Sequence, residues 1–429
     1  MRILHTSDWH LGRSFGPVSL LSHQAAFADW LVGVVEAESV DLVVVAGDVY
    51  DRAFPPNEAV VLFRETLRRL RGVGARVAVI TGNHDAADRV DTYNDLLDSS
   101  GVLLRGGYSK IGEVLRLDMA DGPLDLVLLP FLDPQAAPDH LPHLEGSVRE
   151  VDAPRVSVVP VPPVVSDQLD LLALLAEPEP EPDPEEQAAA DAFAVRMRRT
   201  HQSVLRSAVD AVTPHLRAPR SLAVAHAFVT GGATCESERA LSVGGSGTVD
   251  AALFRPFSYT ALGHLHQPQA FGHGGRLRYS GTPLAYSFSE THAKSVTIVD
   301  MDAAGSCTAT EITVPVGRRV LSVSGTMEEL LRRPVPAEDR ECFVQATITD
   351  GGVVLDARQR LAAVYPHVVE IVLAPPQHTS AGTTAVDHRR QSPLAIADLF
   401  WSDSTGAAPT EDEQALLHAA IAEAAGMVG

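Results

Sequence analysis

Short apolar runs alternate with longer amphipathic segments through the first 130 residues of the chain. The run at 42–46 is Leu-Val-Val-Val-Ala, and such a block of β-branched residues is typical of a fully buried strand. Comparable runs at 3–6 and 77–80 predict two further strands. Apolar residues at helical spacing predict a helix over 23–38, and a pair of prolines opens a second helix over 56–70. Strands that alternate with helices in this way predict an α/β sandwich.

Two later parts of the chain repeat this alternation. A helix over 187–213 is predicted ahead of strands that begin near 221, 259, 276 and 295. The sequence after residue 318 predicts a compact β-α-β-α-β unit, with its elements at 320–323, 326–332, 342–348, 356–364 and 368–373. Further helices are predicted at 92–98, 393–401 and 411–425. The last of these has a capping box formed by Thr410 and Glu413.

Residues 134–186 have a different composition. They are rich in proline and end in the run 177–186, where six carboxylates are interspersed with prolines. A segment of this kind buries too little apolar surface to offset the entropy lost on ordering. We therefore expect an extended, solvated insertion here rather than a packed element. The pattern as a whole divides the chain into residues 1–315, which include the insertion, 316–378 and 379–429.

Composition narrows the class of protein without deciding its function. The chain has 429 residues, which is too long for one ordinary core, and its 45% hydrophobic content is normal for a globular protein. Three widely spaced cysteines form neither a zinc pattern nor a disulfide framework, so we expect a reducing, cytoplasmic environment. We find no apolar run long enough to span a bilayer, and expect no signal peptide and no membrane partner.

A net charge of −21 argues, by itself, against a general nucleic-acid binder. The charges are unevenly spread, however. The segment 64–76 holds five arginines and no lysine, and further arginines gather at 196–206 and 318–319. If the substrate is DNA, the surface that meets it must be locally basic, and these three segments are the candidates.

Polar side chains follow the predicted strands where those strands end, which is where open α/β sheets place their sites. Asp48 is the most unusual of them, because a carboxylate at the mouth of a buried strand costs free energy unless a cation or partner stabilises it. The set contains oxygen and imidazole donors but no cysteine, which suits Mn²⁺, Fe²⁺ or Zn²⁺. The candidates are Asp8, His10, Asp48, Asn83, His84, His226, His264 and His266.

Each of these short motifs also has a purely structural interpretation. Asp8-x-His10 could cap a strand, and Gly82-Asn83-His84-Asp85 could form a turn, because glycine and asparagine tolerate positive φ. A lone His226 could be a satisfied buried imidazole, and His264-x-His266 fits chance as well as it fits a metal pair. Five strand-end segments that all carry metal-compatible donors are far less expected by chance.

The order of these motifs resembles that of the calcineurin-like metallophosphoesterase superfamily. Within it, segments at 4–12, 236–245 and 279–290 resemble the SbcD family of bacterial nuclease subunits. The resemblance covers most of residues 1–300, although Thr282 stands where a serine is expected and the insertion departs from the family pattern. It implies an αββα sandwich of two mixed sheets in a nuclease domain. It further implies a small α+β DNA-capping domain at 316–378, and C-terminal helices that bind a partner.

The resemblance also implies two divalent ions, for which we expect Mn²⁺. One ion would be held by Asp8, His10, Asp48 and His266, and the other by Asp48, Asn83, His226 and His264. Asp48 would bridge the ions at a spacing of about 3.5–4 Å. His84 would have no ligand role, but would protonate the leaving oxygen or stabilise charge on the phosphate. Asp51 or Asp85 could orient His84, and we favour Asp51.

The leading hypothesis from this resemblance is a metal-dependent DNA phosphodiesterase that acts in repair and recombination. The family implies double-strand exonuclease and single-strand or hairpin endonuclease activity. It also implies a homodimer within a heterotetramer, regulation by an SbcC-type coiled-coil ATPase, and a place at the nucleoid. A phosphoprotein phosphatase or small-molecule phosphoesterase remains the alternative, because residues 47–52 have a phosphatase-like spacing and the net charge suits it. A non-enzymatic scaffold is disfavoured because every ligand position is filled.

Overall fold

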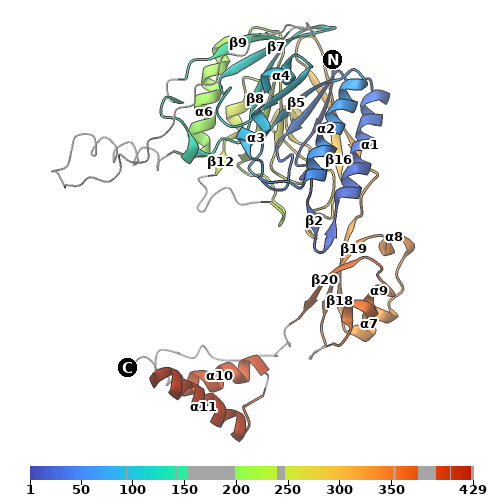
Figure 1. The fold of residues 1–429 in the computed structure, drawn as a ribbon, viewed down its shortest axis with the longest axis vertical. Helices are drawn as coiled ribbons and strands as arrows, with labels where there is room; N and C mark the ends of the chain where they lie inside the picture. Colours follow the sequence, from blue (N-terminus) through green and yellow to red (C-terminus); the bar gives the residue numbers. More distant parts are fainter. Residues whose placement is uncertain are drawn as a thin grey trace, which may run out of the picture. The chain divides into compact units, whose positions relative to one another are not determined.

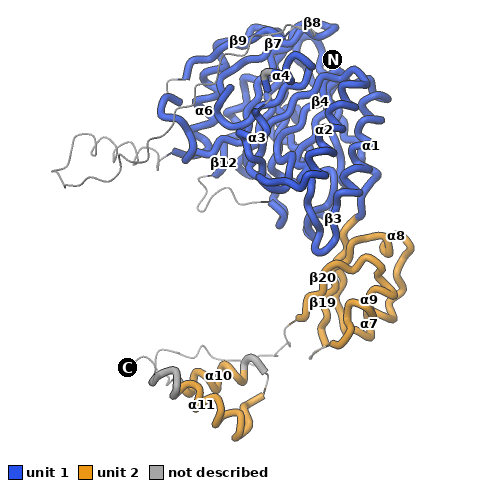
Figure 2. Tube along the Cα trace, viewed as in Figure 1, with its two compact units in different colours: residues 1–318 blue, residues 319–429 orange. Residues whose placement is uncertain are grey.

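The computed structural model describes residues 1–92, 94–141, 144–151, 199–238, 247–350, 354–374, 393–405 and 407–426. The chain divides into two units, Met1–Arg318 and Arg319–Gly429 (Figure 2). The acidic run 177–186, the first part of the helix predicted over 187–213 and the expected loop before residue 393 lie outside the described residues.

Two mixed sheets form the centre of the first unit. The six-stranded sheet has the order β17-β16-β1-β4-β5-β6, in which β1, β4, β5 and β6 are parallel and β16 and β17 run antiparallel to their neighbours. Its strands are β1 (Arg2–Thr6), β4 (Leu42–Ala46), β5 (Arg76–Ile80), β6 (Val102–Arg105), β16 (Ser295–Met301) and β17 (Cys307–Thr313).

The second sheet has seven strands in the order β14-β15-β13-β10-β8-β7-β9. Its four central strands are parallel to one another, and β7 and β14 pair antiparallel with them. The strands are β7 (Glu113–Met119), β8 (Gly122–Leu129), β9 (Ser147–Val151), β10 (Ser221–His226), β13 (Tyr259–Gly263), β14 (Gln269–Phe271) and β15 (Leu277–Tyr279). Short strands elsewhere are β2 (Ser14–Phe15), β3 (Val18–Ser19), β11 (Phe228–Val229) and β12 (Thr248–Val249).

Side chains alternate between the two faces of each strand, so each sheet contributes to two cores. One core lies between the two sheets, and the other lies between the outer face of that sheet and the helices that cover it. In β4, Val44 packs in the core between the sheets, whereas Val43 and Val45 pack against α1 (Leu21–Ala37) and α2 (Asn57–Gly72). The outer face of the second sheet is covered by α6 (His201–Val212). Figure 1 shows α1 and α2 on one side of the paired sheets and α6 on the other. The predicted αββα sandwich of two mixed sheets is confirmed.

The structure differs from the sequence-based prediction at three places. In the described part of the helix predicted over 187–213, α6 begins only at His201, because Thr200 has an extended backbone and caps the helix with its side chain. Two short helices, α3 (Ala87–Asp91) and α4 (Asn94–Asp98), take the place of the single helix predicted over 92–98. The start of the insertion is packed rather than solvated, because Leu141 is buried and β9 pairs in parallel with β7. The remainder of the insertion, from residue 152, is outside the described residues.

The second unit begins with the predicted β-α-β-α-β order. A parallel sheet of β18 (Val320–Gly325), β19 (Phe343–Ile348) and β20 (Val368–Leu373) packs with α7 (Met327–Arg332) and α9 (Ala357–Ala362), while α8 (Ala337–Arg340) adds a turn. The last described helices are α10 (Pro393–Thr405) and α11 (Glu411–Gly426). The predicted capping box is present, since the Glu413 N–H donates to Thr410 Oγ1 and the Thr410 N–H donates to Glu413 Oε2. Among the helices that the structure describes, none is long and apolar enough to cross a membrane.

Candidate metal centre

The candidate residues meet where the carboxyl ends of strands from both sheets approach each other. Asp8 and His10 follow β1, Asp48 follows β4, and His226 ends β10. The sheets come close here because Gly263, the last residue of β13, has no side chain. A Cβ at this position would lie 1.8 Å from the main-chain oxygen of Ala46 in β4. The same oxygen accepts a hydrogen bond of 2.9 Å from His226 Nδ1, which joins the two sheets at the site.

The backbone of the site is strained. Six non-glycine residues in the described part of the chain have positive φ, and four of them are Asp8, His10, Asp48 and His264. A non-glycine residue in this region costs on the order of 1–3 kcal/mol and persists where the surrounding structure holds it. Here Asp8 N–H donates to Gly47 O at 3.0 Å and His10 N–H donates to Asp48 O at 2.9 Å. Strain concentrated on the candidate ligands indicates that their positions matter more than local stability does.

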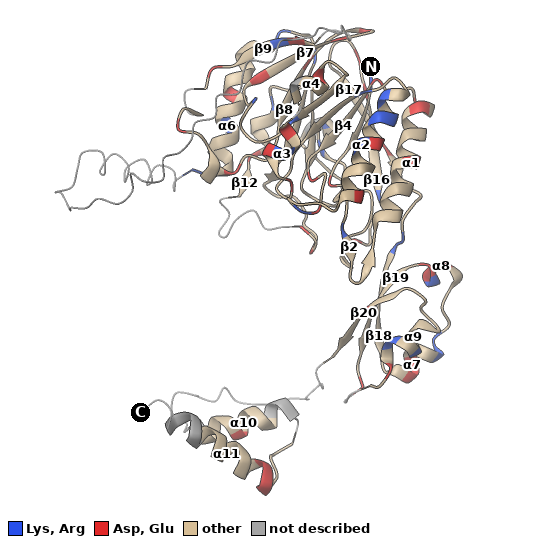
Figure 3. Cartoon of the chain, in the orientation of Figure 1, with Lys and Arg blue, Asp and Glu red and all other residues tan. Residues whose placement is uncertain are grey.

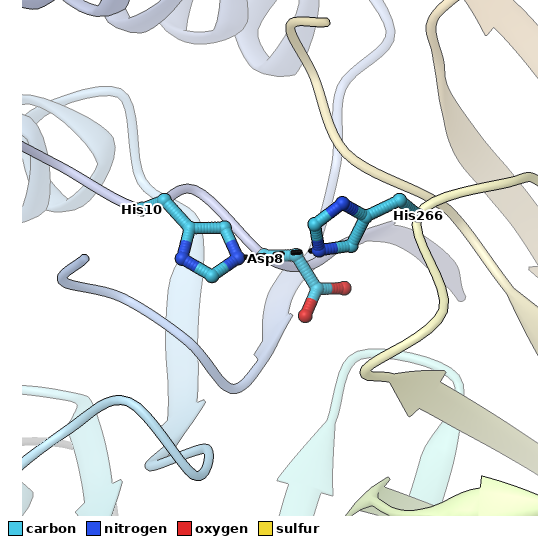
Figure 4. A group of neighbouring side chains, drawn as sticks. All are labelled: Asp8, His10 and His266. Atoms are coloured by element: carbon cyan, nitrogen blue, oxygen red, sulfur yellow. Dashed lines mark hydrogen bonds between the residues drawn. The ribbon is translucent and has the colours of Figure 1, made fainter. Parts of the chain in front are cut away.

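Asp8, His10 and His266 form the first of three groups whose potential ligand atoms lie within 4.8 Å of one another. Figure 4 shows the imidazoles of His10 and His266 facing each other, with the Asp8 carboxylate beside them. The two Nε2 atoms are 3.3 Å apart, and all three side chains are buried. Donors from β1 and from the segment after β13 thus converge on one point.

Asp48 belongs to the other two groups, with His10 and His84 in one and with Asp8 and His226 in the other. Its Oδ2 atom lies 3.7 Å from His10 Nε2 and 3.6 Å from His226 Nε2. One carboxylate oxygen therefore stands between an imidazole of each sheet. A carboxylate in this place could contact an ion held by either imidazole.

Asn83 joins the remaining histidines. Its Oδ1 atom lies 2.9 Å from His226 Nε2 and 3.2 Å from His264 Nδ1. Because His226 Nδ1 donates to a main-chain oxygen, a neutral His226 points the lone pair of Nε2 at the amide oxygen. Two acceptors facing each other repel, and a cation between them would relieve the repulsion. The donor set therefore fits a metal ion.

Burial keeps the histidines in the form that binds metals. Desolvation lowers the pKa of His10 and His264 well below 6.5, and lowers the pKa of His226 and His266 as well. Each is then a neutral imidazole near pH 7. Burial, and next the charge of Asp48, raise the pKa of Asp8 well above its usual value. Two buried carboxylates repel each other when both are ionised, and divalent cations between them would remove that repulsion, which is a further reason that the site fits such ions.

Glu290 lies behind His266 and orients it. The buried carboxylate accepts from His266 Nδ1 at 3.2 Å and from Thr282 Oγ1 at 3.0 Å, and it also bonds Ser237 and Lys294. Burial alone would raise the pKa of Glu290, but the hydrogen bond from His266 and the charge of Lys294 lower it below its usual range. An ionised carboxylate holds the proton on Nδ1 and leaves Nε2 facing the site, as outer partners of metal-bound histidines do.

The sequence analysis assigned no role to Glu290. It lies within a segment that carries the family resemblance, and nothing in its spacing marks it as a partner of a histidine 24 residues earlier. The sequence offered one sign of the role of Glu290, which is the lysine four residues after it, Lys294. This spacing is common between charged residues on helix surfaces, so it does not by itself indicate a functional carboxylate.

His84 lies at the edge of the centre, with its ring centroid 4.7 Å from that of His10. Its Nδ1 atom is 2.9 Å from Asp51, but the contact is with the main-chain oxygen. Asp51 therefore contacts His84, as favoured from the sequence, although its carboxylate takes no part. That carboxylate instead accepts from Arg13 at 3.2 Å.

Asp85, the alternative partner for His84, also has a different place. Its carboxylate accepts from the N–H groups of Val49, Tyr50 and Gly82, at 3.1, 2.8 and 2.9 Å. It therefore joins the loop after β4 to the loop after β5. Burial, and then the charge of Asp48, raise the pKa of Asp85 to about 7.

The arginines of 64–76 do not surround the centre. Arg68 pairs with Glu65, Arg69 pairs with Asp29, and Arg71 donates to Ala75 O. Arg68, Arg69 and Arg71 lie in the second half of α2, roughly 17–21 Å along the helix axis from its first residue, Asn57. Figure 3 shows basic residues at the end of α2 that lies close to the label of the chain's N-terminus.

In the other predicted basic segments, Arg206 is exposed on α6 and Arg199 pairs with Asp139. Arg196 and Arg198 lie outside the described residues, and Arg319 lies close to Glu338 and Asp339. Arg13, which was not predicted from the sequence, reaches the edge of the centre and donates to Asp51.

Similarity to known proteins falls on both units. Residues 1–142 match the calcineurin-like phosphoesterase family, and residues 316–405 match the type 5 capsule protein repressor C-terminal domain. The SbcD subunit of the SbcCD nuclease from Bacillus subtilis (strain 168) is 35% identical over 324 residues, which cover 74% of this chain and 71% of the relative. The SbcD subunit of the same nuclease from Staphylococcus epidermidis (strain ATCC 12228 / FDA PCI 1200) is 24% identical over 408 residues, or 94% of each chain.

Proposed function

The chain belongs to the SbcD family of nuclease subunits, and we propose that it hydrolyses DNA phosphodiester bonds at the buried Asp–His centre. The observation that carries this proposal is the place of Asp48. Its carboxylate lies within 4 Å of one imidazole from each sheet, among buried donors that suit two divalent ions.

Seven residues would hold the two ions. Asp8, His10, Asp48 and His266 support one, and Asp48, Asn83, His226 and His264 support the other. Mixed oxygen and imidazole donors are consistent with Mn²⁺, which we propose as the working metal. When bound, such ions would supply Lewis acidity towards phosphate oxygens and would lower the pKa of a water molecule. The neutral amide of Asn83 adds a donor oxygen without adding negative charge, which favours an anionic substrate.

His84 is proposed to act on the leaving group. Its Nδ1 atom donates to Asp51 O, which fixes the ring beside His10 and leaves Nε2 for the substrate. A protonated Nε2 can donate its proton to the departing oxygen of the cleaved phosphodiester, or stabilise charge on the phosphate. The main-chain contact orients the ring whatever side chain residue 51 carries, so we assign no proton transfer to the Asp51 carboxylate.

The second unit is proposed to serve DNA and partner binding. We assign DNA capping to 316–378 and partner docking to 379–429, with an SbcC-type coiled-coil ATPase as the partner. Exposed apolar side chains on α10 and α11, among them Phe400 and Leu416, support docking because such surfaces mark interaction sites. We further propose that the chain forms a homodimer within a heterotetramer and that ATP in the partner regulates it. Its activities would be those of a double-strand exonuclease and a hairpin endonuclease, and its location would be cytoplasmic, at the nucleoid.

A nuclease assay with the purified full chain tests the proposal. With Mn²⁺, the wild type should degrade linear duplex DNA, more so with its ATPase partner. His84→Gln should lower the rate by about 10²–10⁴-fold, as loss of a general acid does, while Mn²⁺ binding measured by calorimetry persists. His140→Gln, which changes a histidine in an exposed turn, is the matched control and should cleave like the wild type. Hydrolysis of phosphopeptides or p-nitrophenyl phosphate with DNA left intact would favour the phosphatase alternative.

A further inference from the structure

An exposed aromatic ring lies a few residues from the predicted metal ligands in the loop after β4. Phe54 follows Asp48 and Asp51 in this loop, and it is 74% exposed. Its loop neighbours Val49 and Tyr50 are buried. The guanidinium of Arg89, from α3, lies over the Phe54 ring with Cζ 4.2 Å from the ring centroid. Neither residue of this Phe54–Arg89 pair has a place in the chemistry described above.

The pair is anchored to the centre through two short loops. Asp85 accepts hydrogen bonds from Val49, Tyr50 and Gly82, so it fixes the loop that carries Phe54 to the loop that leads to Arg89. The bond between His84 Nδ1 and Asp51 O ties the same loops a second time. Because Phe54 is three residues from Asp51 and Arg89 is five residues from His84, the length of the chain keeps the pair within about 10–17 Å of these two residues.

We propose that the Phe54–Arg89 pair is a stacking platform for an unpaired nucleobase next to the phosphate being cleaved. The inference rests on the proposed nuclease function and specifies which DNA it takes. Nucleobases stack on aromatic rings and on guanidinium planes, and every base offers such a face, so the contact tolerates any sequence. The positive charge of Arg89 also attracts the neighbouring phosphates.

The platform distinguishes unpaired bases from bases that are stacked within a duplex. Within a duplex, both faces of a base are covered by its neighbours, and they become open only in a single strand, a hairpin loop or a frayed end. Stacking on Phe54 is therefore available to unpaired nucleotides and closed to the interior of a duplex. The pair favours cleavage at such positions without any contact to a base edge.

The test compares two single strands that share a phosphate backbone. One is oligo(dT), and the other is an abasic oligonucleotide with the same number of phosphates. The full chain with Mn²⁺ is assayed for kcat/KM on both, as wild type, Phe54→Ala, Phe54→Trp and Leu96→Ala. Leu96 is equally exposed on α4 and serves as the control. Calorimetric titration with Mn²⁺ in each variant reports on the centre independently of cleavage.

The wild type should prefer oligo(dT) over the abasic strand by about tenfold, the size of one base stack. Phe54→Ala should abolish that preference with Mn²⁺ binding unchanged, whereas Phe54→Trp and Leu96→Ala should retain it. The platform is refuted if Phe54→Ala keeps the preference, or if it slows both strands equally. A wild type that cleaves neither strand nor duplex DNA contradicts the nuclease function itself, so the two failures are distinguishable.

Discussion

At the scale of single residues, Asp48 has contacts that no neighbour can replace. Its Oδ2 atom faces His10 from the first sheet and His226 from the second, while its Oδ1 atom accepts the N–H of His84 at 2.9 Å. The first two contacts need a charged carboxylate if cations lie between the groups. The third needs only an acceptor oxygen. A substitution that keeps the acceptor and removes the charge therefore separates metal binding from loop structure.

Asp48→Asn is that substitution, and it should weaken both ions together. Loss of an outer partner alone costs 10–100-fold in metal affinity, so loss of a shared ligand should cost roughly a hundredfold or more at each ion. His10→Ala and His226→Ala should mainly affect one ion each. Calorimetric titration with Mn²⁺ gives the stoichiometry and affinity of every variant. An Asp48→Asn protein that keeps one ion at wild-type affinity would exclude the bridging role.

The site residues that were predicted from the sequence are positioned by local chain order, whereas those that were missed are positioned by tertiary contacts. Asp8, Asp48 and His226 each end or follow an apolar strand, so their place in the chain indicated them. Glu290 was missed because packing alone sets it against His266. Asp51 was favoured as the partner of His84, but it acts through its main-chain oxygen, which no side-chain pattern encodes. Contacts that depend on tertiary packing or on the backbone cannot be predicted from residue types alone.

At the scale of elements, Gly263 decides how closely β13 approaches β4. Gly263→Ala would place a Cβ 1.8 Å from Ala46 O, where only backbone movement relieves the clash. We expect a loss of about 1–3 kcal/mol in the free energy of unfolding, as in other overpacked cores, and weaker Mn²⁺ binding because the ends of the two strands hold ligands. Denaturant unfolding and metal titration measure the two effects.

Gly33→Ala is the control, because nothing lies within 4 Å of a Cβ built at this position in α1. Alanine in a helix interior should raise the free energy of unfolding by about 0.5–1 kcal/mol and leave metal binding unchanged. Equal stability and equal metal affinity in the Gly263→Ala and wild-type proteins would show that the sheets separate there without cost.

Strands and helices were predicted best where the pattern of apolar residues continues without interruption along the whole element. β4 was predicted to the residue because all five of its side chains are apolar and buried. β9 was missed because its side chains are half or fully exposed and it lies within the proline-rich segment 134–186. Its place in the sheet depends on β7 and on Arg149, which forms ion pairs with Asp98 and Glu113. Such distant partners leave no local period in the sequence.

At the scale of the whole molecule, the charge balance opposes the proposed substrate. The net charge is −21, and six of the carboxylates lie in 177–186. The arginine cluster that the sequence offered as a DNA surface lies along α2, apart from Arg76 in β5, and its members Arg68 and Arg69 pair with neighbouring carboxylates. Residue counts indicated the sign of the overall field but not the position of any basic surface, because positions depend on the fold.

Replacing the six carboxylates of 177–186 with serine should therefore speed DNA association. The change takes the net charge from −21 to −15 wherever the segment lies, and long-range repulsion slows encounter with a polyanion. Stopped-flow binding to labelled duplex should show a severalfold faster association at 10 mM salt, where the Debye length is about 30 Å, and a gain that vanishes towards 1 M salt, where it is about 3 Å. The control exchanges the same six residues conservatively, Glu→Asp and Asp→Glu. It keeps the net charge and should associate with DNA as fast as the wild type. If the serine variant binds no faster at low salt, the acidic run does not oppose DNA, and the overall charge does not limit the rate of encounter.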